Sequence, residues 1–211
     1  MTSEPRRLRA DAARNRQALI DAAERLFASK GLAVTLDDIA AEAGVNVATA
    51  YRHFANKHEL AQAFLRQSIT RTITITQEAA AFADPWAGLV HFLERTLELM
   101  GDNRGLIDVL THAYGSDWFE ELQGAVEPLI ADLLARGQRA GAVRGDLCPP
   151  DFGLILPMLG SIAGADPATA TRLRRRCLSL VLAGLRPSDV ALAGPPPTDE
   201  DVRPAASGGA R

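Results

Sequence analysis

The fold of this chain is decided by the stretch TLDDIAAEAGVNVATAYRHFANKHEL, residues 35–60. Thr35 is a favourable N-cap for one helix, and Gly44 ends that helix because glycine enters the left-handed region at little cost. Asn46 then caps a second short helix. Two short helices joined by a glycine turn predict a helix-turn-helix over residues 36–54.

The second of these helices, residues 47–54, has an inner and an outer arc on a helical wheel. The inner arc contains Val47, Ala50, Tyr51 and Phe54, and the outer arc contains Ala48, Thr49, Arg52 and His53. In a helix-turn-helix the second helix enters the major groove of DNA, so we expect the outer arc to face bases. Ala48 suits a thymine methyl group, Thr49 a hydrogen bond to a base or phosphate, and Arg52 a guanine. For Tyr51, at the edge of the inner arc, we expect a buried ring and a hydroxyl directed to a phosphate.

The rest of the chain repeats apolar residues at the helical period, which predicts an all-α fold. Residues 69–76 alternate like a strand, but they continue a longer amphipathic run, so we interpret them as helix. The predicted helices cover residues 12–29, 57–80, 85–100, 104–114, 118–140, 150–163 and 167–185. Pro85 and Pro167 suit the first turn of a helix. Pro128 and Pro157 fall inside apolar-periodic runs, where we expect kinked or split helices.

The composition is typical of a folded globular protein, with 47% hydrophobic and 23% charged residues. Cys148 and Cys177 form no paired motif and the histidines are few, so neither a disulfide framework nor a metal site is predicted. There is no P-loop, dinucleotide fingerprint, GxSxG or HExxH motif, and we expect no enzyme. The sequence has no export signal and no apolar run long enough for a membrane span, which predicts a cytoplasmic protein.

The charge of the chain is unevenly distributed. The net charge is -3, yet residues 1–57 contain nine Lys and Arg against seven Asp and Glu, and the remainder contains fourteen against nineteen. Five arginines lie between Arg6 and Arg16. A basic end of this kind favours a phosphate backbone even when the whole molecule is acidic.

From about Arg14 to Leu60 the chain resembles the DNA-binding domain of the TetR (tetracycline repressor) family. The likeness is carried by IAAEAGV at 39–45 and by the block YRHF with the Lys and Leu that follow it, at 51–60. The resemblance implies phosphate-backbone contacts by Thr35, Leu36, Tyr51, His53 and Lys57, base contacts by Val47, Ala48 and Thr49, and further DNA-facing groups at Asn46 and Arg52. Asn46 departs from the family, whose members often have serine there.

The same resemblance implies that the larger helical C-terminal domain dimerises and binds a small-molecule inducer. In the family the last two long helices form a four-helix bundle with those of a second copy, which here are residues 151–163 and 168–185. The apolar residues expected at this dimer interface are Leu154, Ile155, Met158, Leu159, Ile162, Leu173, Cys177, Leu178 and Val181. These apolar residues are more numerous than a helix at the periphery of a monomer needs to bury.

An inducer pocket is expected to be mainly apolar with a few polar groups. The candidate contacts for this unidentified inducer are Trp86, His91, Arg95, His112, Tyr114 and Trp118. Apart from this inducer, no cofactor and no metal ion is predicted.

We therefore expect a basic N-terminal arm at 1–11, a helix-turn-helix domain at 12–56 and a regulatory and dimerisation domain at 57–186. A tail at 187–211, rich in Pro, Gly, Ala and Ser, is expected to be disordered. The predicted function is that of a homodimeric regulator of double-stranded operator DNA, a repressor released by its inducer. The alternatives are a helical protein-interaction module without ligand response and a transcriptional activator of the same fold.

Overall fold

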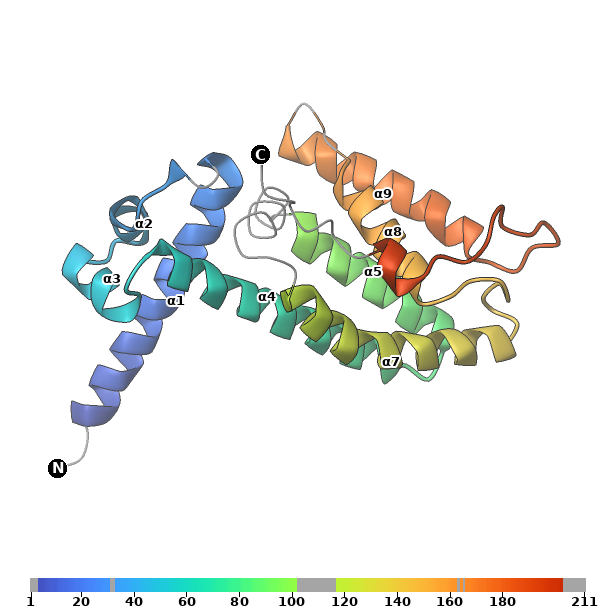
Figure 1. The fold of residues 1–211 in the computed structure, drawn as a ribbon, viewed down its shortest axis with the longest axis horizontal. Helices are drawn as coiled ribbons and strands as arrows, with labels where there is room; N and C mark the ends of the chain where they lie inside the picture. Colours follow the sequence, from blue (N-terminus) through green and yellow to red (C-terminus); the bar gives the residue numbers. More distant parts are fainter. Residues whose placement is uncertain (1–3, 31–32, 102–116, 163, 165, 203–211) are drawn as a thin grey trace. The chain divides into compact units, whose positions relative to one another are not determined.

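The protein is described by a computed structural model that covers the chain except residues 1–3, 31–32, 102–116, 163, 165 and 203–211 (Figure 1). The described residues form helices joined by turns and contain no β-strand, which confirms the all-α class. They divide into an N-terminal unit, up to Ser68, and a C-terminal unit, from Ile69. The division falls inside a helix and not at residue 57, where the domain boundary was expected.

The N-terminal unit begins with helix α1, Glu4–Lys30, followed by α2, Leu36–Ala43, and α3, Val47–His53. Helix α1 starts eight residues before the predicted start at residue 12, so the expected basic arm is mostly helical. Alanine, leucine and arginine favour helix, and Pro5 lies in the first turn, where a proline is tolerated.

The core of the N-terminal unit forms where α1 packs against α2 and α3. Its buried side chains are Leu19, Ile20, Ala23, Leu26 and Phe27 of α1, Ile39 and Ala40 of α2, Ala50 of α3, and Phe54. Ala40 and Ala50 are completely buried, so the helices approach closely at these small residues. The predicted apolar stripe of α1 is confirmed, as is that of α2 at Leu36, Ile39 and Ala40.

Helix α4, Lys57–Ala80, begins in the N-terminal unit and ends in the C-terminal unit. Residues 69–76, which alternate like a strand, are helical as predicted. Thr76 is buried, and its hydroxyl donates to the carbonyl of Thr72 at 2.8 Å, so the helix satisfies this polar group itself.

The C-terminal unit contains α5, Pro85–Gly101, α7, Asp117–Arg139, α8, Pro150–Gly160, α9, Pro167–Gly184, and the short α10, Asp199–Val202. Helices α5 and α9 start at the predicted prolines. Helices α7 and α8 continue through Pro128 and Pro157, so neither is split. The predicted helix at 104–114 lies outside the described residues.

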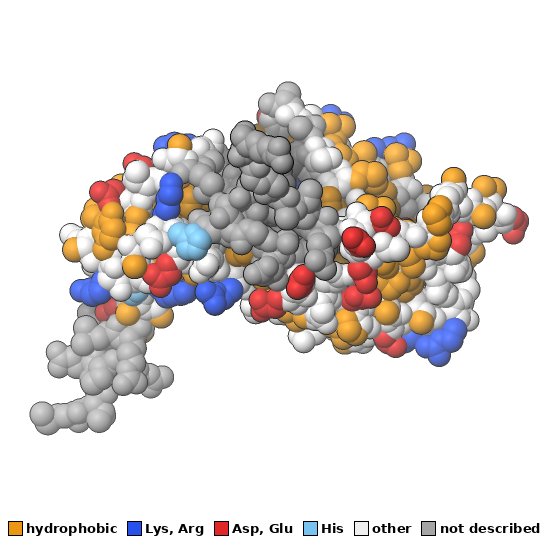
Figure 2. All heavy atoms as spheres, viewed as in Figure 1, with side chains coloured by type: hydrophobic (Ala, Val, Ile, Leu, Met, Phe, Trp, Pro, Cys, Tyr) orange, Lys and Arg blue, Asp and Glu red, His pale blue; other side chains and the backbone are white. Residues whose placement is uncertain are grey.

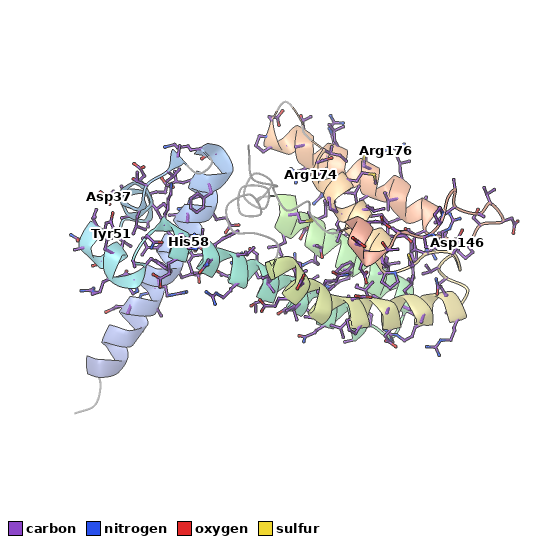
Figure 3. All side chains as sticks on the ribbon, viewed as in Figure 1. Asp37, Tyr51, His58, Asp146, Arg174 and Arg176 are labelled. Atoms are coloured by element: carbon purple, nitrogen blue, oxygen red, sulfur yellow. The ribbon has the colours of Figure 1, made fainter. Side chains whose placement is uncertain are left out.

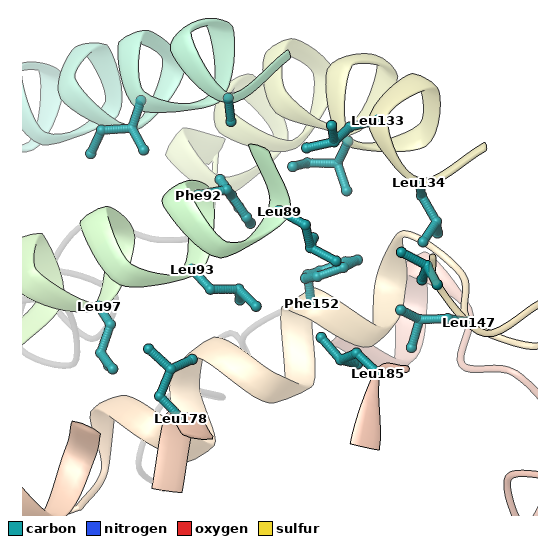
Figure 4. Close-up of a cluster of buried hydrophobic side chains, with 14 of the residues drawn as sticks. Leu89, Phe92, Leu93, Leu97, Leu133, Leu134, Leu147, Phe152, Leu178 and Leu185 are labelled. Carbon is teal, nitrogen blue, oxygen red and sulfur yellow. The ribbon is translucent and has the colours of Figure 1, made fainter. Parts of the chain in front are cut away.

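Helix α5 is the centre of the C-terminal unit, because α7, α8 and α9 all pack against it (Figure 4). Phe92 of α5 meets Phe152 of α8 edge to face, with ring centroids 6.0 Å apart. The buried cluster around this pair includes Leu89, Leu93, Leu97, Ile130, Leu133, Leu134, Leu147, Leu159, Leu178 and Leu185. This core draws on all four of these helices and on Leu147 of the loop before α8.

The segment after α9 is anchored to the C-terminal unit, whereas the sequence predicted disorder from residue 187. Arg144 donates to both carboxylate oxygens of Asp146 and to the carbonyls of Gly184 and Val190. The backbone N–H of Leu192 donates to the same carboxylate at 2.8 Å. The buried guanidinium of Arg144 and its partner Asp146 thus hold Val190 and Leu192, through donors and acceptors that composition does not reveal.

Helix α10 packs on α8 at a glycine. A Cβ added to Gly153 would lie 2.9 Å from the Cβ of Val202, closer than side chains normally approach. The missing side chain at Gly153 is what allows α10 to lie against α8.

We expect Asp146→Asn to lower the melting temperature by several degrees at pH 7. The hydrogen bond from Arg144, followed by that from Leu192, lowers the pKa of the Asp146 carboxyl. Folding thus favours its ionised form, so its contribution is complete above the ordinary aspartate range and declines steadily as the pH falls from about 4 toward the lowered pKa of the folded protein. Thermal melts of both proteins from pH 7 to pH 3 check this: the difference between them should shrink with acidity. A constant difference would contradict it.

Candidate nucleic-acid interface

Helix α2 begins with a reciprocal cap that the sequence predicted only in part. The Asp38 backbone N–H donates to the Thr35 hydroxyl at 3.1 Å, and the Thr35 backbone N–H donates to the Asp38 carboxylate at 2.9 Å. The side-chain hydrogen bond from Thr35 lowers the pKa of Asp38. Thr35 is exposed, but Leu36, the other residue expected against the DNA backbone at this point, is buried.

The turn between α2 and α3 depends on Gly44, which has a φ of 65°. The N–H of Val45 donates to the Ala40 carbonyl at 2.9 Å and closes the end of α2. Asn46 then starts α3, since its side-chain oxygen accepts from the N–H of Ala48 at 2.9 Å. The predicted glycine turn and asparagine cap are both confirmed.

Gly44→Ala is expected to destabilise the protein by about 1 kcal/mol, because an L residue is strained at positive φ. No atom lies within 4 Å of the Cβ that this change adds, so the cost is conformational and not steric. Gly124→Ala is the matched control: it also adds a methyl group in open space, but inside α7, where alanine is favoured by about 1 kcal/mol. Urea denaturation should show opposite signs, and destabilisation of equal size by both would contradict the conformational explanation.

Helix α3 exposes more of its surface than the wheel predicted. Ala50 and the following Phe54 are buried, but Val47 is 41% and Tyr51 51% exposed. The inner arc is therefore narrower than expected, because α3 has only seven residues and rests on the core at its end. The correction adds Val47 and Tyr51 to the exposed surface.

The outer arc of α3 presents polar groups at its centre and end. Arg52 is exposed, and its Nη2 donates to the hydroxyl of the half-buried Thr49 at 3.4 Å. Ala48 is exposed and His53 is half-buried, with its ring 6.5 Å from that of Phe54. The structure thus brings together on one short helix the residues that the sequence proposed as base-facing.

Helix α4 starts immediately behind α3. The side-chain oxygen of Asn56 accepts from the N–H of Glu59 at 3.0 Å, and the Glu59 carboxylate accepts from the N–H of Ala55 at 2.7 Å. Lys57, the first residue of α4, is half-buried. The rigid start of α4 places this cation one turn beyond α3, beside a helix N-terminus that itself favours anions.

One polar contact in this surface involves a residue that the sequence did not single out. The carboxylate of Asp37, in the first turn of α2, raises the pKa of the Tyr51 hydroxyl by hydrogen bonding and then by its negative charge; both residues are labelled in Figure 3. A helical wheel of α2 shows only that Asp37 is exposed. Its proximity to Tyr51 depends on how α2 and α3 pack together, which the wheel does not show.

The N-terminal unit also displays its basic side chains. Figure 2 shows Lys, Arg and His side chains on the visible face of this unit, with carboxylates among them. Arg16 of α1 lies over the ring of Phe54, with its Cζ 5.0 Å from the centroid. Exposed Arg52 and Arg16 thus lie in the same compact unit.

The candidate inducer contacts are only partly described. Trp86 lies beneath Arg186, whose Cζ is 3.5 Å from the ring centroid. His91 forms a 3.1 Å contact with the carboxylate of Glu78, and Arg95 is exposed and pairs with Glu98. The positions of His112 and Tyr114, and the side chain of Trp118, lie outside the described residues.

The candidate dimer residues divide into three groups according to their exposure in the single chain. Leu159 and Leu178 belong to the core of a single chain, which corrects their predicted place on its surface: both face inward, in the cluster around α5. Ile155, Ile162, Leu173, Cys177 and Val181 are half-buried. Leu154, Met158 and also Leu180 are at least half exposed and form the apolar surface of α8 and α9.

No group of three or more His, Cys, Asp or Glu side chains that could hold a metal ion is found in the part of the chain that the structure describes. Among the helices described there, none has both the length and the apolar character of a membrane span.

Short helices α2 and α3, fixed by caps and a glycine turn against α1, define a helix-turn-helix protein. Residues 19–64 match the family described as bacterial regulatory proteins, tetR family, and residues 84–187 match the C-terminal domain of SbtR-like transcriptional regulators. The chain belongs to the TetR family of bacterial transcriptional regulators.

Curated relatives agree with this assignment. An HTH-type transcriptional repressor of Mycobacterium tuberculosis, Rv3405c, is 34% identical over 168 residues, which are 74% of this chain and 81% of the relative. The regulator TtgR of Pseudomonas putida is 49% identical over 61 residues, 28% of this chain and 29% of TtgR. The Tn10 TetC protein of Escherichia coli is 26% identical over 58% of this chain and 66% of TetC. The matches to TtgR and TetC thus span less than two thirds of those proteins.

Solved structures show the same architecture. A TetR regulatory protein of Mycobacterium vanbaalenii is 31% identical, with a TM-score of 0.64 over 85% of this chain and 99% of that one. The regulator SCO0520 of Streptomyces coelicolor is 28% identical, with a TM-score of 0.65 over 82% and 99%.

Proposed function

We propose that the protein is a homodimeric repressor that binds a specific double-stranded operator, is released by a small-molecule inducer, and acts in the cytoplasm without enzymatic activity. The observation that carries this proposal is the exposed surface of α3, where Val47, Ala48, Thr49 and Arg52 project from a helix capped at its start. A helix presented in this way fits a major groove and reads base edges.

Flanking groups would fix the register of α3 on the duplex. Thr35 at the start of α2, Tyr51 and His53 of α3, and Lys57 of α4 are the proposed phosphate contacts, and Asn46 supports the first turn. Phosphate contacts bind every sequence alike, whereas the side chains of the outer arc distinguish sequences.

A second copy would supply the second half-site. The exposed apolar side chains Leu154, Met158 and Leu180 support pairing of α8 and α9 with those of another chain. Two α3 helices separated by one turn of DNA, about 34 to 36 Å, then read a pseudo-palindrome.

Release by an inducer requires a link between the C-terminal unit and α3. Helix α4 belongs to both units, and Ile75 and Ala79 near its end are buried in the cluster around α5. A ligand held among Trp86, His91, Arg95, His112, Tyr114 and Trp118 would shift α4. It would release DNA only if it binds the released conformation more tightly than the DNA-bound one.

The division of DNA contacts is tested by fluorescence anisotropy with the duplex upstream of the protein's own gene and an unrelated duplex. We expect Lys57→Gln to weaken binding to both and to reduce the slope of log affinity against log salt by about one unit. Thr49→Ala should change the ratio between the two duplexes, and Thr49→Ser, which keeps the hydroxyl, should restore it. Equal losses on both duplexes for Thr49→Ala would contradict a base contact.

The same assay separates the alternatives. A protein-interaction module would ignore both duplexes at low salt. An activator would bind the operator, but deletion of its gene would lower transcription of the neighbouring gene instead of raising it.

A further inference from the structure

The C-terminal end of α4 is completed by a side chain from α7. A helix leaves its last carbonyls without helical N–H partners, and these carbonyls need other donors. The Ala79 carbonyl accepts from the backbone N–H of Phe82 at 3.2 Å. The Ala80 carbonyl instead accepts from Nη2 of Arg136 at 2.7 Å, and the Phe82 carbonyl accepts from Nη1 of the same guanidinium at 3.2 Å. One arginine of α7 thus holds two carbonyls at the end of α4.

The guanidinium of Arg136 is itself held in place on α7. Its Nε lies 3.1 Å from the carboxylate of Asp132, one turn earlier on the same helix, and its side chain is 28% exposed. A guanidinium is planar and presents its donors in a fixed fork, so it holds two acceptors in a defined geometry. Its positive charge is also favoured beside the C-terminal end of a helix. These contacts therefore fix the direction of the last turn of α4 as well as its distance from α7.

Helix α5 meets the same end of α4 at a glycine. A Cβ added to Gly88 would lie 2.5 Å from the carbonyl oxygen of Ala79 and 3.0 Å from Cδ1 of Leu133 on α7. Ala79 is completely buried. The end of α4 is thus held by close backbone contact with α5 and by hydrogen bonds from α7, all within the C-terminal unit.

We propose that Arg136 is a positioning residue for operator binding: by fixing the end of α4 to α7, it sets the spacing at which a dimer presents its two α3 helices. The inference rests on the proposed function, in which a dimer reads two half-sites. Helix α4 begins shortly after α3 and is continuous to Ala80, so a change in its direction reaches α3. Without the bonds from Arg136, the dimer would accept a wider range of half-site spacings and bind the native spacing less tightly. Binding to a single half-site would not change.

The test is Arg136→Gln, measured on duplexes that differ in half-site spacing. Footprinting of the duplex upstream of the protein's own gene locates the two half-sites. Anisotropy then compares this duplex with versions that have one base pair added or removed at the centre, and with a duplex that contains one half-site. One base pair changes the separation by about 3.4 Å and the rotation by about 35°.

We expect the wild-type protein to bind the altered spacings about tenfold more weakly than the native spacing, because both α3 helices no longer fit at once. Arg136→Gln should bind the native spacing about fivefold more weakly than wild type and the altered spacings about equally well, so that its preference falls to about twofold. A residue that only stabilised the fold would weaken binding to every duplex by the same factor.

Arg139→Gln is the matched control. It removes a cation three residues further along α7, whose Nε donates to the Ala135 carbonyl of its own helix at 3.2 Å. This variant should keep the wild-type preference for spacing. Hydrogen exchange at residues 77–82 should become faster in Arg136→Gln and not in Arg139→Gln, which verifies that the end of α4 is released. Arg136→Lys keeps the charge but lacks the planar fork, and it replaces Arg136→Gln, with the same expected direction, if that variant does not fold.

The outcomes distinguish this inference from the function on which it rests. A reduced spacing preference with unchanged half-site affinity, found for Arg136→Gln and not for Arg139→Gln, supports the positioning role. An unchanged preference, equal weakening on all duplexes, the same change in Arg139→Gln, or a wild-type protein indifferent to spacing overturns it while the proposed function stands. A wild-type protein that binds no duplex overturns the proposed function, and the positioning role with it.

Discussion

Replacing both Met158 and Leu180 with glutamate is expected to convert the protein to monomers and to weaken operator binding at least about 100-fold. Each chain would bring two charges to the dimer interface, and all of them would have to be desolvated there. Both side chains are more than half exposed in the single chain, at 54% and 60%, so the substitutions should leave its fold intact. A monomer offers one α3 helix, and the second half-site no longer adds to affinity. Light scattering at micromolar concentration and anisotropy on the operator measure the two effects.

Val190→Glu is the control for this experiment. Val190 is another exposed apolar residue of the C-terminal unit, but it lies outside α8 and α9. We expect this variant to remain a dimer that binds as tightly as wild type. A Met158→Glu/Leu180→Glu protein that remains dimeric would place the interface elsewhere, and a monomer with wild-type affinity would remove the need for a dimer.

The helix-turn-helix is the part of the fold that sequence predicts best, because its signals are local. Thr35 and Asn46 cap the helices that follow them within three residues, and Gly44 has the positive φ that its position required. These interactions depend on neighbours in sequence and little on the rest of the fold. The prolines that begin α5 and α9 were predictable for the same reason.

Features that depend on contacts across the chain were not predictable. The wheel of α3 gave its period but not the width of its buried face, so the wheel placed Val47 on the inner arc although the family resemblance implied a base contact there. The placement of Val190 follows from Arg144, which is distant in sequence from the carbonyl that it binds. Leu159 and Leu178 carry the same apolar signal as Met158, and packing alone decides which of them face inward.

Phe54 is a core residue that supports the end of α3. Its side chain is 1% exposed, and its backbone N–H donates to the Ala50 carbonyl at 2.9 Å at the end of α3. Phe54→Ala should destabilise the N-terminal unit by about 3 to 5 kcal/mol, the usual cost of a large cavity. A small unit has little more stability than this.

Phe54→Ala is therefore expected to abolish DNA binding at 25 °C, although Phe54 itself makes no proposed DNA contact, because α3 loses the core on which it rests. Hydrogen exchange should show lost protection in α2 and α3 and retained protection in α5 and α7. Phe54→Leu, which fills most of the space, should cost no more than about 1.5 kcal/mol and keep binding. If Phe54→Ala binds the operator normally, α3 holds its place without this core, and the capping interactions of Thr35 and Asn46 would have to suffice.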